Sequence, residues 1–268
     1  MKKTIVILLC LLAFTAVDAF AVSIAASQAL GYISAEYYYD ISAEDMLEME
    51  NICENYENEQ AIELIVSKLD EYSEYYTAQY IKNLSAQTLP QNDLESLETD
   101  GMFYIKINTF AADTGSKFQD IWNSVEENDK VFVDLTDCTG GYISSMLETA
   151  RCLLPDGVVC VAQYKDKTEV YEVEDSLIKL PYENLYILVS EKTASSAEIL
   201  SCAVKTQKCG TVLGSSNTFG KTSIQRLVPL KSGGIMKFTI GEYSVPHSET
   251  ITGTGVVPDR IMPQPVNK

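Results

Sequence analysis

Residues 131–141 read VFVDLTDCTGG, a mostly apolar run from Val131 to Leu135 that leads into a pair of glycines, Gly140 and Gly141. A short apolar run of this kind is typical of a buried strand in a parallel sheet. Glycines beyond such a strand let a ligand approach the backbone closely, and open α/β sheets bind ligands at this edge. A simple turn would use the same two glycines, so the stretch predicts a strand and leaves its function open.

Strands and helices alternate on both sides of this stretch. Alternating apolar residues predict a strand at 103–107, and apolar runs predict buried strands at 158–162 and 185–189. We expect further strands at 211–213 and on either side of 232–234. Helical spacing predicts helices around Phe118 and Trp122, after Gly141, and from Ser196 to about Lys205. This order predicts an α/β domain with a mostly parallel sheet flanked by helices, plus a small N-terminal helical region.

Changes in composition divide the chain into four regions. We expect a leader at 1–19, a helical region at 28–84, a polar linker at 85–101 and the α/β core at 102–268. Ser42 with Asp45 resembles a capping box at the start of one helix in the second region. These helices are rich in acid and tyrosine, so they would serve either as a homodimer contact or as a solvated cap.

The first residues have the pattern of a signal peptide. Lys2 and Lys3 precede an apolar run from Thr4 to Val17, and small residues at Val17 and Ala19 suit a signal peptidase. We therefore expect a protein that acts outside the cytoplasm, secreted or at the cell surface. The alternative is an uncleaved leader that continues to Ala26 and tethers the protein to the membrane.

The charge and the cysteines narrow the classes of ligand. The formal net charge is −18, which repels a phosphate backbone and opposes a nucleic-acid partner. None of the seven cysteines forms a CxxC pair, and His247 is the single histidine. These counts give little support to a zinc site. We also expect no cofactor. Disulfides are compatible with an exported protein, but the sequence does not give their pairing.

The turn between the predicted strand at 185–189 and the following helix carries Ser195. A hydroxyl at a helix N-terminus lies beside free backbone N–H groups and the positive end of the helix dipole. Such N–H groups can bind the oxyanion of an acyl-transfer reaction. Plain helix capping by Thr193, Ser195 or Ser196 is the alternative.

A second reactive side chain follows in the sequence TFGK at 218–221. Lysine acts as a general base only when it is neutral, which requires that burial lower its pKa. The neighbouring apolar residues Phe219 and Ile224 fit that requirement. An exposed surface lysine is the alternative interpretation of Lys221.

Taken together and in order, these motifs resemble the C-terminal processing peptidases, also called tail-specific proteases. The resemblance runs from about Tyr104 to Asp259. It is carried by VFVDLTDCTGG at 131–141, TASSAEI at 193–199, TFGKTSIQ at 218–225, and Pro246 with GTGVVPD at 253–259.

The resemblance implies a fold and a set of roles. It implies a crotonase- or Clp-protease-like core and a serine-type endopeptidase that uses an acyl-enzyme and needs no metal. Ser195 matches the nucleophile, Lys221 the general base and Gln225 the residue that orients it. The backbone N–H groups of Ser196 and of Gly140 or Gly141 would then form the oxyanion hole.

The chain also departs from this family pattern. The interval between Tyr80 and Met102 is too short for the PDZ domain that the family usually carries, and Thr136 and Cys138 replace the usual Arg and Asn. These departures leave open a degenerate homologue that only binds peptides or partner proteins. Glu198 fits a structural role as well as a catalytic one.

Two further alternatives carry less support from the sequence. Because the core is similar to the crotonase fold, a CoA-dependent enzyme is another interpretation of the function. The leader and the acidic surface oppose it. His247 is a competing base for Ser195, but no motif places an acid partner beside it.

Overall fold

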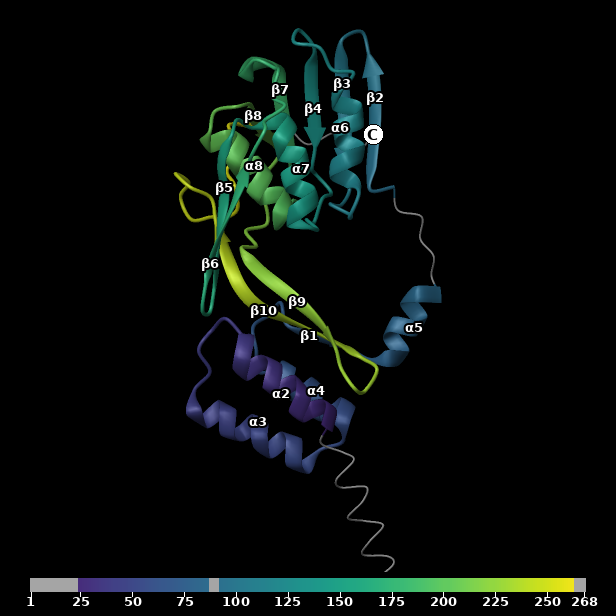
Figure 1. Ribbon diagram of the computed structural model, residues 1–268, viewed down its shortest axis with the longest axis vertical. Helices are drawn as coiled ribbons and strands as arrows, with labels where there is room; N and C mark the ends of the chain where they lie inside the picture. Colours follow the sequence, from purple (N-terminus) through teal and green to yellow (C-terminus); the bar gives the residue numbers. More distant parts are fainter. Residues whose placement is uncertain (1–23, 87–91, 263–268) are drawn as a thin grey trace, which may run out of the picture. The chain divides into compact units, whose positions relative to one another are not determined.

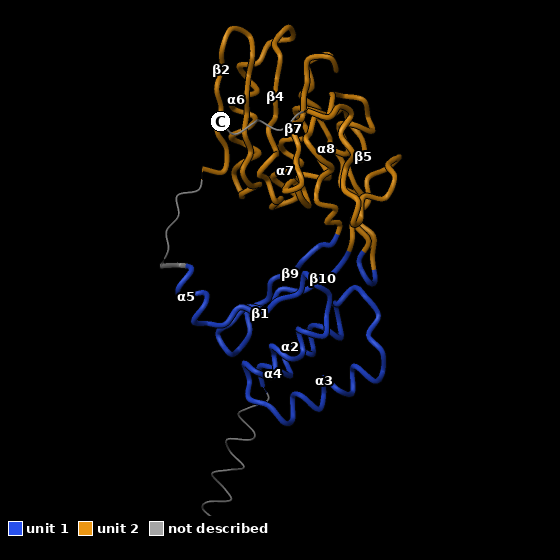
Figure 2. The backbone as a smooth tube through the Cα atoms, turned by 180° about the vertical axis from the view of Figure 1, so that it is seen from behind, with its two compact units in different colours: residues 1–89, 164–166, 223–241 blue, residues 90–163, 167–222, 242–268 orange. Residues whose placement is uncertain are grey.

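The computed structural model describes residues 24–86 and 92–262, which form two compact units (Figure 1). The first unit contains the described residues up to 86 together with 164–166 and 223–241. The second unit contains 92–163, 167–222 and 242–262 (Figure 2, blue and orange). The predicted leader at 1–19 lies outside the described residues. Among the helices that are described, none is both long and apolar enough to cross a membrane.

The first unit combines helices with a small antiparallel sheet. Its elements are α2 (Ile24–Glu36), α3 (Ala43–Asn55), α4 (Asn58–Val66), β1 (Glu74–Tyr76), α5 (Ala78–Ala86), β9 (Ser223–Pro229) and β10 (Ile235–Ser244), whose last three residues belong to the second unit. The predicted cap of α3 is confirmed, because the Ser42 hydroxyl accepts the Asp45 N–H at 3.0 Å. β10 pairs antiparallel with β1 and also pairs with β9.

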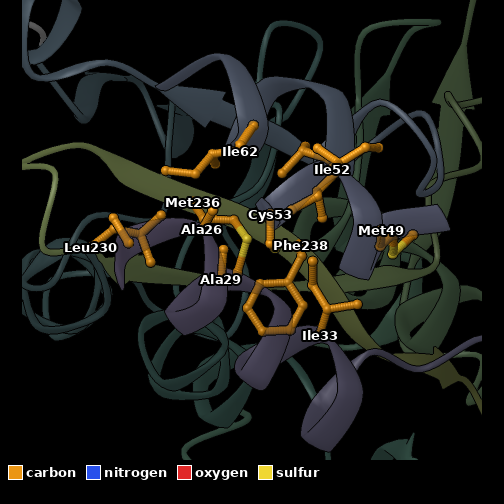
Figure 3. Packing of buried hydrophobic residues seen from close by; sticks show 14 of the residues in the cluster. Ala26, Ala29, Ile33, Met49, Ile52, Cys53, Ile62, Leu230, Met236 and Phe238 are labelled. Carbon is orange, nitrogen blue, oxygen red and sulfur yellow. The ribbon is translucent and has the colours of Figure 1, made fainter. Parts of the chain in front are cut away.

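The hydrophobic core of the first unit lies between these helices and the β9–β10 hairpin (Figure 3). Small residues on α2, Ala26 and Ala29, let the helix approach Met236 and Phe238 of β10. Ile62 of α4 completes this cluster, and the five side chains are fully buried. The hairpin thus belongs to the helical unit, although the sequence predicts it as part of the core at 102–268.

The second unit is built on a six-stranded sheet in the order β11-β8-β7-β4-β3-β2. These strands are β2 (Leu94–Thr99), β3 (Met102–Ile107), β4 (Lys130–Asp134), β7 (Leu185–Val189), β8 (Thr211–Gly214) and β11 (Arg260–Ile261). All neighbours pair in parallel except β2, which is antiparallel to β3. The predicted α/β fold with a mostly parallel sheet is confirmed.

Three helices accompany this sheet, with α7 packed between the other two. They are α6 (Thr114–Trp122), α7 (Ile143–Leu153) and α8 (Ser196–Thr206). A short 3-10 turn, η1 (Tyr182–Asn184), lies between β6 and β7. An antiparallel hairpin, β5 (Gly157–Tyr164) and β6 (Thr168–Val173), follows α7. The helices follow β3, β4 and β7, and α8 therefore starts at the carboxyl edge of the sheet.

The structure differs from the sequence prediction at the expected linker. Residues 94–99 of the stretch 85–101 form β2, whose side chains are mostly exposed. An edge strand that is solvated on both faces lacks the apolar alternation by which strands are recognised. Its polar composition is therefore that of a linker, while its backbone pairs along the full length of β3.

We expect Phe238→Ala to destabilise the first unit strongly. Replacing a fully buried Phe by Ala removes apolar contacts and leaves a cavity, which typically lowers the free energy of unfolding by about 3–5 kcal/mol. Denaturant unfolding monitored by circular dichroism would measure the change. Leu47→Ala on the exposed side of α3 is the control and should change it by less than about 0.5 kcal/mol. Equal effects of the two variants would contradict the described core.

Candidate active site

The turn that carries Ser195 is fixed to the end of β4. The buried Thr193 hydroxyl donates to Leu135 O at 2.7 Å and accepts the Ser190 N–H at 3.0 Å. The Ala194 N–H donates to Cys138 O at 3.0 Å. Two neighbouring strands of the sheet therefore deliver the segments 135–141 and 190–195 to the same place, as the glycine pair and the serine motif predict.

Ser195 itself has an unusual backbone conformation. Its φ is 58° and its ψ is −124°, and it precedes the first residue of α8. A non-glycine residue in such a region is strained by about 1–3 kcal/mol and needs support from its surroundings. The side chain is half-buried. A capping serine does not require this conformation, because N-cap residues normally have extended backbones.

Gly140 lies directly against this serine. A Cβ on Gly140 would lie 2.8 Å from Ser195 Cβ and 3.2 Å from Ser196 N. The segment is fixed by the Phe110 N–H, which donates to Gly140 O at 2.9 Å, and the backbone φ of 105° suits only glycine. A side chain at this position would therefore fill the space beside the serine.

The N–H groups that are predicted to bind an oxyanion have no acceptor within the described chain. Gly140, Gly141 and Ser196 donate no backbone hydrogen bond to another described residue. Gly140 and Ser196 also flank Ser195 closely. These N–H groups can therefore bind a ligand oxygen beside the serine hydroxyl.

The loop that carries Lys221 runs alongside the serine turn. The Phe219 N–H donates to Thr193 O at 2.9 Å, two residues before Ser195. On its other side the loop meets the segment at 253–256, where Gly255 lies so close to Thr218 that a Cβ would be 2.0 Å from Thr218 O. The lysine motif and the closing segment of the family pattern therefore pack together.

Glu198 joins the serine turn to the lysine loop. Its carboxylate is fully buried, and each of its two oxygens accepts two hydrogen bonds. Oε2 accepts the N–H groups of Ser195 and Lys221, both at 2.9 Å. Oε1 accepts the Gly220 N–H at 2.6 Å and the Thr218 hydroxyl at 2.5 Å. Burial raises the pKa of the Glu198 carboxyl, and these four donors oppose that rise.

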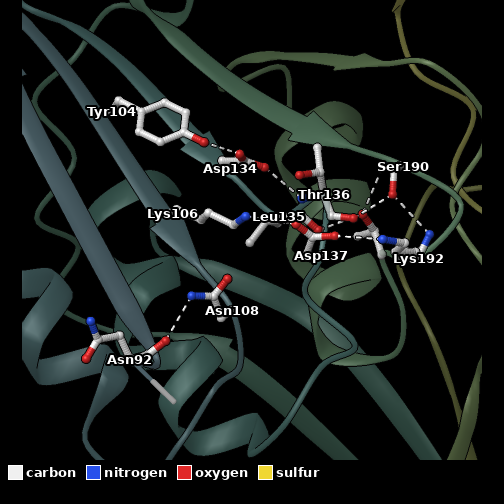
Figure 4. Close-up of polar contacts among 11 residues, drawn as sticks. Asn92, Tyr104, Lys106, Asn108, Asp134, Leu135, Thr136, Asp137, Ser190 and Lys192 are labelled. Atoms are coloured by element: carbon white, nitrogen blue, oxygen red, sulfur yellow. Dashed lines mark hydrogen bonds and ion pairs between the residues drawn. The ribbon is translucent and has the colours of Figure 1, made fainter. Parts of the chain in front are cut away.

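A polar network extends from the other side of the serine turn (Figure 4). Lys106 and Lys192 donate to Asp137 from opposite sides, at 2.8 and 3.0 Å, and their hydrogen bonds lower the pKa of the Asp137 carboxyl. The Thr136 N–H donates to Asp134 at 2.8 Å, and Thr136 O accepts the Ser190 hydroxyl at 2.5 Å. This network connects the ends of β3, β4 and β7.

Two sequence-predicted candidates make none of these contacts. Gln225 is on β9 in the first unit, where its amide donates to Ser223 at 2.9 Å and to Thr239 at 3.1 Å, so its predicted role beside Lys221 stays a prediction. His247 is exposed and forms no ion pair with a carboxylate of the described residues. Among the described residues, no carboxylate is therefore paired with His247 as a Ser-His mechanism would require.

Potential metal ligands and cysteines among the described residues form neither a metal-holding group nor a disulfide. No group of three or more His, Cys, Asp or Glu side chains there is arranged to hold a metal ion. The six cysteines from Cys53 to Cys209 are all buried and free, so no disulfide joins the described residues. Burial raises the pKa of the Cys138 thiol, next to the glycine pair, to about 11.

Comparison with known proteins agrees with this arrangement of motifs. The family model described as peptidase family S41 matches residues 101–262, which is more than half of the chain. The chain belongs to peptidase family S41. The resemblance to C-terminal processing peptidases that the sequence motifs predict is therefore confirmed.

Curated relatives of this S41 chain are longer proteins. Carboxyl-terminal-processing peptidase 2, chloroplastic, from Arabidopsis thaliana is 32% identical over 164 residues, which cover 60% of this chain and 32% of that protein. The carboxyl-terminal-processing protease of Synechocystis sp. is 28% identical over 165 residues, which cover 61% of this chain and 38% of that protein. The chain thus spans about a third of the length of these relatives.

Solved structures share the fold of this S41 chain. The photosystem II D1 C-terminal processing protease has a TM-score of 0.56 at 24% identity, over 66% of this chain and 50% of that one. A lipoprotein from Streptococcus agalactiae has a TM-score of 0.71 at 17% identity, over 88% of this chain and 90% of that one. At these identities the likeness establishes the fold.

We expect Glu198→Gln to destabilise the second unit. An amide places NH2 where one carboxylate oxygen accepts two donors, which leaves both donors unpaired at about 1–3 kcal/mol each. Because the pKa of Glu198 is raised in the folded state, the wild-type protein loses stability relative to Glu198→Gln as pH rises from about 4.5 through the folded-state pKa. The difference in unfolding free energy should therefore be largest at acid pH.

Denaturant unfolding at several pH values would measure both effects. Glu172→Gln, an exposed carboxylate on β6 of the same unit, is the matched control and should change the free energy of unfolding little at any pH. A Glu198→Gln variant as stable as the wild type at every pH would show that the four hydrogen bonds do not hold the two loops together.

Proposed function

We propose that the protein is a serine peptidase in which Ser195 is the nucleophile and Lys221 the general base. One observation carries this proposal. Glu198 accepts the backbone N–H groups of both the strained Ser195 and Lys221, and the unpaired N–H groups of Gly140 and Ser196 lie beside that serine. Membership of peptidase family S41 supports hydrolysis of peptide bonds by such a cluster.

In the proposed acylation step the Ser195 hydroxyl attacks the carbonyl carbon of a peptide bond. Neutral Lys221 takes the hydroxyl proton as the new C–O bond forms. The carbonyl oxygen gains negative charge and is bound by the N–H groups of Ser196 and Gly140. The C–N bond then breaks, and the protonated lysine returns its proton to the leaving amine.

Deacylation repeats this sequence with water as the nucleophile. Lys221 takes a proton from the water as its oxygen attacks the acyl carbon, and the same N–H groups bind the oxyanion of the tetrahedral intermediate. The ester bond to Ser195 then breaks, the lysine returns the proton to the serine oxygen, and the peptide leaves with a new carboxyl group. The substrate is a polypeptide, as peptidase family membership implies. We place it outside the cytoplasm because of the leader pattern at Lys2, Lys3 and the apolar run that follows.

We expect Ser195→Ala and Lys221→Ala each to abolish cleavage of casein and of fluorogenic peptides. Removing the nucleophile or base of such a unit typically lowers kcat by about 10⁴-fold or more. Initial rates of the purified protein lacking the leader would measure the loss. Ser144→Ala and Lys130→Ala, at exposed positions of α7 and β4, are the matched controls and should retain activity.

Labelling by a fluorophosphonate separates this proposal from its alternative. A reactive serine is expected to become covalently modified at Ser195 in the wild type and in neither of the two site variants. Undiminished cleavage by Ser195→Ala or by Lys221→Ala would end the proposed mechanism. No labelling of the wild type, combined with measurable peptide binding, would instead identify a degenerate homologue that binds peptides.

We expect Gly140→Ala to reduce kcat by at least about 10²-fold, the effect of losing one oxyanion donor. The added methyl would lie 2.8 Å from Ser195 Cβ and 2.9 Å from Ala194 O, so the serine or the glycine segment must move. Gly157→Ala is the matched control, because Gly157 also has a positive φ but its Cβ would meet nothing within 4 Å. Equal kcat values for the two alanine variants would contradict the assignment of Gly140 to the oxyanion hole.

A further inference from the structure

Tyr243, near the end of β10, has a buried hydroxyl that reaches both reactive segments. The side chain is 4% exposed, and its position belongs to the second unit. The hydroxyl lies 2.6 Å from Lys221 O and 3.0 Å from Ser195 O, so its single proton is shared between these two acceptors. No motif in the sequence marks this tyrosine.

The two oxygens do not depend equally on this hydroxyl. Ser195 O already accepts the N–H groups of Glu198 and Ile199 in the first turn of α8, at 2.8 and 3.1 Å. Lys221 O, in contrast, lies in a loop without regular secondary structure and has the shorter contact with Tyr243. The hydroxyl therefore restrains mainly the lysine loop, because the start of α8 is already held by its own helical hydrogen bonds.

Tyr243 and Glu198 hold the same two residues from opposite ends. Glu198 accepts the N–H groups of Ser195 and Lys221, and the hydroxyl proton of Tyr243 is shared between the C=O groups of both. Both side chains are buried, so water does not replace either one. Each reactive residue is thus fixed on both sides of its Cα, the atom from which its side chain projects.

The tyrosine is itself well supported. Its backbone N–H donates to Thr222 O at 3.0 Å, which ties β10 to the residue after Lys221. Burial raises the pKa of the Tyr243 hydroxyl well above its ordinary value, so the group keeps its proton and remains a donor. Donation to a carbonyl needs that proton at every pH at which the site would work.

We propose that Tyr243 is a positioning residue whose hydroxyl sets the place of Lys221 relative to Ser195. This inference rests on the proposed function, because it assumes that the lysine takes the serine proton. A displacement of about 1 Å between reacting groups can reduce the rate about 10²-fold. A hydroxyl that only stabilised the fold would change the amount of folded protein and leave the turnover of each folded molecule unaltered.

Tyr243→Phe tests the inference because it keeps the ring and removes only the hydroxyl. Steady-state cleavage of a fluorogenic peptide would give kcat and KM, with folded sites counted by exhaustive fluorophosphonate labelling of Ser195. We expect kcat to fall about 10- to 100-fold with KM unchanged, because the loss concerns proton transfer and leaves substrate contacts in place. Tyr171→Phe is the matched control, since its hydroxyl donates to Glu169 on β6 of the same unit, and its kcat should equal that of the wild type.

A second variant covers a Tyr243→Phe protein that fails to fold. 4-Aminophenylalanine at position 243 keeps the ring and offers a weaker N–H donor, so kcat should fall severalfold with KM unchanged. A kcat within twofold of the wild type in whichever variant folds would overturn the inference and leave the proposed function standing. A wild-type protein that neither cleaves peptides nor labels at Ser195 would overturn both.

Discussion

The buried carboxylate of Glu198 is the constraint on which the second unit depends. A fully buried carboxylate is tolerated only when its oxygens are satisfied, and here each oxygen accepts two donors. The donors come from the start of α8 and from residues 218–221, so the carboxylate cannot be satisfied unless both segments are in place. The start of α8 and the loop at 218–221 must therefore be in place together for Glu198 to be buried.

The parallel sheet supplies the rigid side of this arrangement. Thr193 and Ala194 bond to the end of β4, and the strained backbone of Ser195 persists because neighbours on both sides hold it. Contacts from sheet, helix and loop thus converge on one residue. Residues 101–262, which match family S41, include all of these contacts, although the chain spans about a third of its curated relatives. All members of the Glu198 cluster therefore lie within the matched segment.

Sequence reasoning reached the parts of this site that are local in the chain. Buried strands appear as apolar runs, and the glycine pair and the serine turn follow such runs directly. The sequence around Glu198 fits a structural and a catalytic role equally, because the other partners of its carboxylate lie 20 to 23 residues away. The sequence does not indicate the role of Tyr243, because its contact with Ser195 spans 48 residues. The β9–β10 hairpin has an ordinary strand pattern, and nothing local indicates that its apolar face packs on the N-terminal helices.

The departures from the family pattern look different once the contacts are known. Thr136 joins the network through its N–H and its carbonyl oxygen. The carbonyl oxygen of Cys138 accepts the N–H of Ala194. Backbone groups make these bonds, and any residue other than proline supplies both groups. Exchanging the side chains at 136 and 138 therefore does not by itself remove the support of the serine turn. The reactivity of Ser195 therefore decides between a peptidase and a degenerate homologue, because the backbone contacts from Leu135 and Cys138 to the serine turn are present in this chain.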